Sequence, residues 1–303
     1  MEIEHKDEVI VPALTFASVA NAVLYTGATP VFVDSHPDYW CINPSKLEEK
    51  ITQKTKAIIP VHLYGHPCDM DSIMKIAKDH DLYVVEDCAE AHGAGYKDRK
   101  VGTFGNIACF SFYGNKIITT GEGGMCLTND EDLAQKMRLL RDHGMNVKKR
   151  YWHEVVGFNY RMTNLQAALG VAQLEKIDKF IERKRKIAEL YNSLLKDARG
   201  VALHPEMPWA KNVYWLYSML IYNVSYGISR DELMNKLAKN DVETRRFFYP
   251  MHLMPPYKRY AVNCHFPITE KLSSSGINLP SSVKLTEKEI YEVAQLIIHF
   301  HQE

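Results

Sequence analysis

LYVVED, residues 82–87, decides the fold: it is a short run of apolar and β-branched residues that ends in two carboxylates. Comparable runs stand on both sides of it, at residues 8–11 (EVIV), 30–34 (PVFVD), 56–61 (KAIIPV), 107–112 (IACFSF) and 124–128 (GMCLT). Near-continuous apolar runs are typical of strands buried on both faces, and the longer segments between them fit helices or loops. The first part of the chain is therefore predicted to be α/β, with a mainly parallel sheet covered by helices.

The pattern changes after this part of the chain. Between Asn164 and Asp197 apolar residues recur at helical spacing among many charges, which predicts one long amphipathic helix that links two domains. We expect a large domain over residues 1–175 and a smaller α+β C-terminal domain over residues 176–303.

The smaller domain is predicted from three further signals. They are a strand at residues 214–224, a helix at residues 229–240 with Ser229 as its N-cap, and a last helix that opens on the capping box of Thr286 and Glu289.

Composition excludes several classes of partner. Lys and Arg total 37 and Asp and Glu total 37, so the chain lacks the positive field of a protein that binds nucleic acid or an anionic membrane. The six cysteines are scattered without metal-ligand spacing, which predicts reduced thiols and no metal site. No window approaches about 18 uninterrupted apolar residues, and the start lacks a basic segment followed by an apolar one. These features predict a cytoplasmic location.

Residues 107–124, IACFSFYGNKIITTGEGG, contain the first candidate for chemistry. Lys116 follows a strand that should be buried and lies among small residues, where desolvation would lower the pKa of its amine and make it a nucleophile. Such a lysine can form a Schiff base. Taken alone, Lys116 fits a solvated loop lysine better, because perturbed lysines are few.

Asp87 is the second candidate. It ends the hydrophobic run of residues 82–87, and open α/β sheets bind ligands at the carboxyl ends of their strands. A buried carboxylate needs a cationic partner, and a protonated pyridine nitrogen would be one. Asp87 and Lys116 at adjacent strand ends therefore fit pyridoxal phosphate chemistry. The alternative for Asp87, the N-cap of a following helix, remains open.

Five ordered motifs point to a known family. They are VPALTFASVANAVLYTGATPVFVD (11–34), IIPVHLYGHPCDMD (58–71), VVEDCAEAHGA (84–94), CFSFYGNKIITTGEGG (109–124) and GFNYRMTNLQAALG (157–170). Together they resemble the DegT/DnrJ/EryC1/StrS family, the fold-type-I aminotransferases that depend on pyridoxal 5'-phosphate (PLP) and modify nucleotide sugars. The resemblance implies the fold of a fold-type-I PLP-dependent transferase.

The resemblance also implies roles for individual residues. Lys116 would hold the cofactor as a Schiff base and later move the proton, Asp87 would pair with the pyridine nitrogen, and Ser111 would bind the cofactor phosphate. Phe16 matches the aromatic position that stacks on the cofactor ring, although a core phenylalanine is the simpler interpretation. Glu90 matches a Glu or Gln position beside the ring.

Two further implications concern partners. Asn159 matches the asparagine that reaches the phosphate from the neighbouring subunit, which implies a homodimer with shared active sites; an isolated asparagine would more often be a turn residue. L-Glutamate is the family's usual amino donor. A branch of the family with histidine at the lysine position performs dehydration, and the presence of Lys116 disfavours that branch.

The substrate is narrowed by two longer stretches. Residues 149–178 and 242–257 resemble the family members that aminate C4 of GDP-4-keto-6-deoxy-D-mannose to give GDP-perosamine. In the second stretch, Arg245, Tyr249 and His252 would face the sugar nucleotide, or they would belong to a packed domain-interface loop. A UDP- or dTDP-linked 4-keto-6-deoxyhexose is the alternative substrate.

The front of the chain departs from the family pattern. Members usually carry a further segment before Asp7, with a Gly-Thr-Ala-type turn whose N–H groups hold the cofactor phosphate at a helix N-terminus. No such turn precedes Phe16. We therefore expect a truncated reading frame or a natural short form. Two classes of function follow, an active aminotransferase and a catalytically silent relative that serves as a binding subunit.

Overall fold

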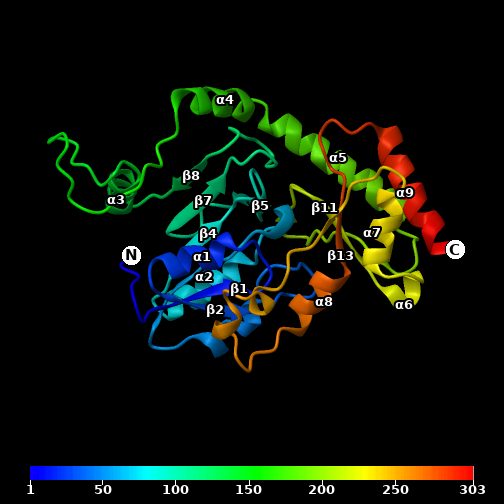
Figure 1. Ribbon diagram of the computed structural model, residues 1–303, viewed down its shortest axis with the longest axis horizontal. Coiled ribbons are helices and arrows are strands. Elements are labelled where there is room, and N and C mark those ends of the chain that lie inside the picture. The colour runs from blue at the N-terminus through cyan, green and yellow to red at the C-terminus, as the bar shows by residue number, and fades with distance from the viewer. Residues whose placement is uncertain (303) are drawn as a thin grey trace.

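A six-stranded sheet forms the centre of the computed structural model, which describes residues 1–302 (Figure 1). Its strands, in spatial order, are β2 (Thr29–Val33), β1 (Glu8–Pro12), β3 (Thr55–Ile58), β4 (Tyr83–Asp87), β7 (Ile107–Ser111) and β8 (Gly124–Leu127). All neighbouring pairs are parallel except β7 and β8, which are antiparallel. The prediction of an α/β fold with a mainly parallel sheet is confirmed.

Alternation along β1 shows why the sheet is covered on both faces. Val9 and Val11 pack into one apolar cluster with residues of α1 (Ser18–Tyr25), whereas Ile10 packs into another with residues of α2 (Met70–Asp79). Side chains of a strand point alternately to its two faces, so a strand with helices on both sides must be apolar throughout. That is the reason the strands read as continuous runs.

The C-terminal part has its own antiparallel sheet, in the order β12 (Arg245–Arg246), β13 (Gly276–Leu279), β11 (Tyr217–Ile221) and β9 (Val201–Ala202). It packs with α5 (Ile177–Leu195), α7 (Arg230–Ala238) and α9 (Glu287–Gln302) around a separate core. The predicted Ser229 cap and the Thr286–Glu289 capping box are both confirmed. The domain division at residue 175 stays a prediction.

The remaining elements are short. They are the three-stranded sheet of β5 (Gly95–Tyr96), β6 (Arg99–Lys100) and β10 (Ala210–Lys211), the α-helices α6 (Asn223–Tyr226) and α8 (Pro267–Ser275), and the 3-10 helices η1 (Pro44–Lys46), η2 (Glu48–Lys50), η3 (Leu63–Gly65), η4 (Met251–Leu253) and η5 (Lys258–Tyr260). No helix within residues 1–302 is long and apolar enough to cross a membrane.

The segment from η4 to α8 returns to the first strands of the chain. The N–H of Met251 donates to the carbonyl of Ala13 at 2.9 Å, and the N–H of Thr269 donates to Oδ1 of Asp34 at 2.8 Å. Late residues thereby close one side of the sheet that early residues form.

The prediction of a single long helix between Asn164 and Asp197 is wrong. The chain forms α4 (Asn164–Leu174) and α5, separated by Glu175 and Lys176, and the backbone leaves helical geometry at Lys176 (φ −110°, ψ 2°). α4 buries none of its residues, whereas α5 packs against the C-terminal core. The apolar spacing continues through both helices. The apolar residues of α4 lie on the surface, however, whereas those of α5 pack into the C-terminal core, so the two helices are separate.

An arm precedes α4. It comprises α3 (Glu131–Arg141) and the chain up to residue 163, and it stands away from the body on the left of Figure 1.

Candidate active site

The ends of two neighbouring strands bring the first candidates together. β4 and β7 are parallel, with Asp87 opposite Cys109, so their carboxyl ends meet at one edge of the sheet. A cavity of about 530 Å³ opens there. Six of the nine residues predicted from the sequence line it: Phe16, Asp87, Glu90, Ser111, Lys116 and Arg245.

Lys116 lies almost completely inside this cavity, with its side chain 12% exposed. Its Nζ is 3.9 Å from Oε1 of Glu90 and 3.8 Å from the ring centre of Trp215. Burial lowers the pKa of the amine, and the negative charges of Glu90 and Asp87 oppose that shift only in part. The solvated-loop interpretation of Lys116 does not hold, because the side chain is mostly buried. A lowered pKa is in keeping with a nucleophilic amine, and that role stays a prediction.

Asp87 keeps one carboxylate oxygen free. Oδ1 accepts the N–H of Ala89 at 3.0 Å, and Oδ2 receives no hydrogen bond from any residue in the described range. Burial raises the pKa of this carboxyl, while the Ala89 N–H and Lys116 act in the opposite direction. No helix begins directly after β4, in residues 88–94, so the N-cap interpretation of Asp87 does not apply. The carboxylate is left to attract a cation in the cavity.

Glu86, the adjacent carboxylate, has a different position and points away from this cavity. It is fully buried and accepts hydrogen bonds from the His62 ring and from the N–H groups of Gly102, Phe104 and Gly105. Burial alone would raise its pKa, but these donors bring the pKa below its usual value. Successive strand residues face opposite sides, so Glu86 holds the loop at 102–105 while Asp87 faces the cavity.

Glu90 is held from the other side of the cavity. Its Oε2 accepts the N–H of Tyr64 at 2.8 Å, and burial raises its pKa to about 7 against the attraction of Lys116. Phe16 is 59% exposed and lies 5.9 Å, centre to centre, from Phe248, which in turn stacks on Tyr64. Phe16 is therefore no core residue, and its ring belongs to an aromatic wall of the cavity.

Trp215 was not predicted from the sequence. Besides its contact with Lys116, its indole N–H donates to the carbonyl of Asn115 at 2.8 Å. The close approach depends on Gly65, because a Cβ there would lie 2.9 Å from the N atom of Trp215. Trp215 appeared only as part of the predicted strand at residues 214–224, since no local signal marks a contact made across about a hundred residues.

Three predicted residues do not line the cavity. Asn159 lies on the arm, where its backbone pairs with that of Asp142 in an isolated antiparallel β-bridge. Tyr249 is 56% exposed and its hydroxyl contacts Arg246, and His252 is buried, with Nε2 2.9 Å from Glu270. In contrast, Arg246, Asn278 and Tyr64 line the cavity without having been predicted.

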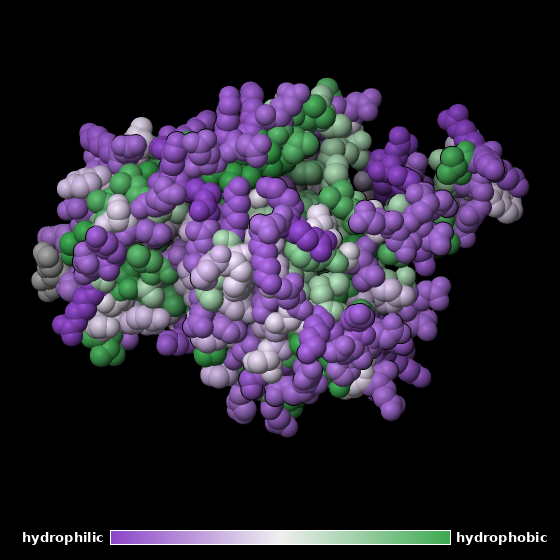
Figure 2. Space-filling view, turned by 180° about the vertical axis from the view of Figure 1, so that it is seen from behind, coloured by the Kyte–Doolittle hydropathy of each residue, from purple (hydrophilic) through white to green (hydrophobic). Residues whose placement is uncertain are grey.

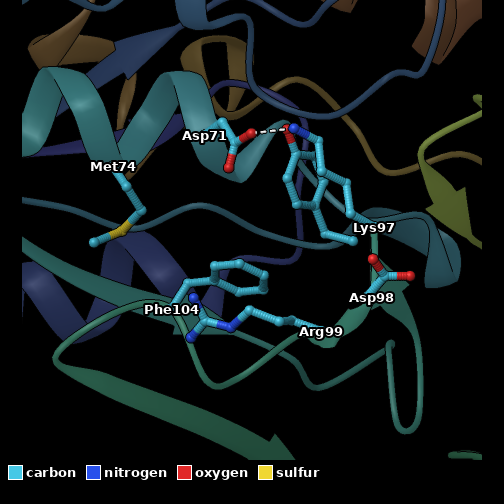
Figure 3. Close-up of a pocket in the computed structure, with 7 residues that line it drawn as sticks. Asp71, Met74, Lys97, Asp98, Arg99 and Phe104 are labelled. Carbon is cyan, nitrogen blue, oxygen red and sulfur yellow. Dashed lines mark hydrogen bonds and ion pairs between the residues drawn. The ribbon is translucent and has the colours of Figure 1, made fainter.

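A second hollow, of about 500 Å³, lies between α2 and the β5–β6 hairpin (Figure 3). Three of its charged side chains have partners: Lys97 pairs with Asp71, and the guanidinium of Arg99 lies 4.1 Å from the ring centre of Phe104. None of the residues predicted to be functional lines this hollow.

Comparison with known proteins shows the class of enzyme: the fold and the sequence are those of PLP-dependent sugar aminotransferases. The DegT/DnrJ/EryC1/StrS aminotransferase family matches residues 1–298, and the chain belongs to this family. It is 48% identical to the GDP-perosamine synthase of Escherichia coli over 99% of this chain and 81% of that protein. It is 47% identical to the GDP-perosamine synthase of Caulobacter vibrioides over 97% of this chain and 79% of that protein.

A solved structure gives the same answer for fold and cofactor. A Streptococcus pneumoniae protein in its PLP form superposes with a TM-score of 0.92 at 27% identity, covering 99% of this chain and 82% of that one. The expected fold-type-I architecture, enzyme class and cofactor are confirmed.

The residues of the cavity fit PLP. The free Oδ2 of Asp87 suits a protonated ring nitrogen, the ring of Phe16 is available for stacking, and Lys116 presents an amine with a lowered pKa. Ser111 adds a hydroxyl at the end of β7. This set combines an amine, an anion and an aromatic face around one space, which is what the cofactor needs.

Proposed function

We propose that this enzyme transfers the amino group of L-glutamate to C4 of GDP-4-keto-6-deoxy-D-mannose and so forms GDP-perosamine. The convergence of Lys116, Asp87 and Ser111 on one cavity supports the aminotransferase chemistry. The names of the two relatives at 47 and 48% identity support the substrate.

In the proposed reaction the bound cofactor supplies an electron-withdrawing ring that stabilises negative charge at the reacting carbon. Asp87 would hold the cofactor through its ring nitrogen, Ser111 through its phosphate and Phe16 by stacking. Lys116 would attach the cofactor and then carry the proton to and from the reacting carbon, a task that suits an amine with a lowered pKa.

Arg245 is proposed to meet the anionic part of the nucleotide sugar. Its side chain is 56% exposed at the cavity, and its acidic neighbour, Glu243, lies 3.8 Å away and is itself 85% exposed. An exposed ion pair of this kind is weak, so the guanidinium can exchange it for a diphosphate. Tyr249 and His252 lie in the same segment and are kept as candidates for outer contacts with the substrate.

The enzyme is proposed to be a homodimer with shared active sites. Large apolar side chains are exposed on the arm and on α4: Val147, Tyr151, Trp152, Val155, Val156, Phe158, Tyr160, Leu165, Leu169, Val171 and Leu174. In Figure 2, apolar surface appears over α4 at the top of the molecule and on the projecting arm. So large an exposed apolar surface is typical of a protein interface. Asn159, on this arm, would reach the partner's cavity.

The proposed function is tested by adding PLP, L-glutamate and a panel of GDP-, UDP- and dTDP-linked 4-keto-6-deoxy sugars and following the release of 2-oxoglutarate. We expect turnover with the GDP sugar and a visible absorption band with PLP alone. Lys116→Ala should abolish both. Turnover with only a UDP or dTDP sugar would contradict the substrate, and a band that persists in Lys116→Ala would contradict the role of Lys116.

A further inference from the structure

Two cysteines face each other beneath the candidate active site. Cys109 on β7 and Cys126 on β8 are direct partners in the antiparallel ladder, and their Sγ atoms are 3.9 Å apart. Neither residue takes part in the proposed reaction.

The backbone shows what kind of pair this is. The carbonyl of Cys109 accepts the N–H of Cys88, the residue that follows β4, at 2.8 Å, so it points away from β8. Residues that face each other without exchanging hydrogen bonds have Cα atoms about 4.5 Å apart. Disulfides span Cα separations of about 4.4–6.8 Å, so rotation of the two side chains can bring the sulfur atoms to bonding distance.

The two thiols differ in the way that disulfide exchange requires. Cys126 is exposed, and its hydrogen bond with Cys109 lowers its pKa to about 7. Cys109 is half-buried. Its hydrogen bond with Cys126 raises its pKa most, and burial raises it further. Cys126 therefore loses its proton more readily than Cys109, and the thiolate is the nucleophile in exchange.

We propose that Cys109 and Cys126 form a dithiol modification site that closes reversibly into a disulfide by exchange with glutathione disulfide. The Cys126 thiolate attacks one sulfur of glutathione disulfide and releases one glutathione thiolate. Cys109 then loses its proton and attacks the Cys126 sulfur, which releases the second glutathione. The cysteine pair gives up two electrons and glutathione disulfide takes them up, while the two protons pass to the two glutathione thiolates.

The position of the pair links it to the active site. Ser111 and Gly124 form another pair of the same ladder, and the loop between these strands carries Lys116. Cys109 and Ser111 are two residues apart on β7, so they share a face of the sheet. A Cys109–Cys126 bond would tie the two ends of the Lys116 loop directly beneath Ser111.

The site is tested by incubating the full-length protein with glutathione disulfide and analysing it by intact mass and peptide mapping. We expect a mass lower by two hydrogen atoms, a cross-linked peptide pair containing Cys109 and Cys126, and reversal by dithiothreitol. The half-buried Cys264 supplies the matched control: Cys264→Ser should behave like wild type, whereas Cys126→Ser should form no internal bridge.

Three outcomes would overturn the proposal: a stable mixed disulfide on Cys126 with no internal bridge, a bridge that includes Cys264, or a bridge between two chains. Amide exchange supplies a second reading that does not depend on enzyme activity. Exchange in residues 112–123 should slow on oxidation while exchange in α7 stays unchanged, and equal rates in both redox forms would refute the link to the Lys116 loop.

Discussion

Asp87 offers the sharpest prediction at the scale of single residues. Asp87→Asn preserves the shape of the side chain and its contact with Ala89 but removes the negative charge that faces the cavity. Loss of one preorganised electrostatic group costs about 100-fold or more in rate. We expect the half-reaction of the PLP enzyme with L-glutamate to slow by at least about 100-fold in a stopped-flow absorbance measurement.

Asp98→Asn is the matched control, because Asp98 is exposed on the β5–β6 hairpin, outside this cavity. It should leave the rate unchanged. Equal rates for Asp87→Asn and wild type would show that the Asp87 charge has no part in the reaction.

Sequence reasoning located the site residues near the strand ends better than those that come from the C-terminal part of the chain. Lys116, Asp87 and Ser111 follow recognisable strands, so adjacent strand ends predict that they meet. Trp215 and Arg246 reach the cavity from the C-terminal part through tertiary contacts, which no local pattern encodes. Family motifs could not reveal Trp215 either, because none of the five motifs extends to it.

At the scale of elements, the turn in η3 allows the backbone at Gly65 to pack closely against Tyr214 and Trp215 of the C-terminal part. Gly65 has φ +104°, and a Cβ there would come within 2.8 Å of the N atom of Tyr214. Gly65→Ala should therefore lower the free energy of unfolding by about 3 kcal/mol, through backbone strain and a steric clash. It should also displace Trp215 from Lys116. Chemical denaturation and tryptophan fluorescence measure both effects.

Gly227→Ala separates strain from the clash. Gly227 has a similar φ of +101°, but its added Cβ would meet no atom within 4 Å. This variant should lose only about 1 kcal/mol and keep the wild-type fluorescence. If both variants behave alike, the close approach at Gly65 is not what positions Trp215.

Lys184 on α5 predicts a pH dependence of stability. Its Nζ donates to the carbonyls of Trp215 and Ser281, both at 2.7 Å, and burial lowers its pKa from 10.5 to about 8. Between these two values the unfolded chain binds more protons than the folded one, so stability rises with pH. The linked free energy is about 3 kcal/mol, gained as pH rises from about 8 to about 10.5.

Urea denaturation across this pH range measures the effect. Lys184→Met should flatten the rise, and Lys186→Met, which alters an exposed lysine of the same helix, should preserve it. An identical slope in wild type and Lys184→Met would exclude Lys184 as its source.

The long apolar runs made most elements of the large sheet predictable. β9 and β12 were missed because each is only two residues long, too short to show a period. The break between α4 and α5 was missed for another reason: the apolar spacing runs through it, and only the packing of α5 against the C-terminal core distinguishes the two helices.

At the scale of the whole molecule, the arm predicts the oligomeric state. Val156 is 94% exposed on the arm, and a charge at this position would be buried in the proposed dimer interface. Val156→Asp should convert dimers to monomers in sedimentation velocity and reduce activity, without changing the far-UV circular dichroism. Val224→Asp, at a position that is 95% exposed on α6, should remain dimeric. A dimer that survives Val156→Asp would place the interface elsewhere.

The return of η4, η5 and α8 to the first strands determines the order in which the protein can mature on the ribosome. Met251 and Phe266 bury side chains against strands made from the first residues of the chain. Those strands emerge long before the segment that covers them, and an uncovered apolar sheet is prone to aggregate. We therefore expect the early strands to need protection, by the ribosome surface or by chaperones, until residues 251–275 have been synthesised.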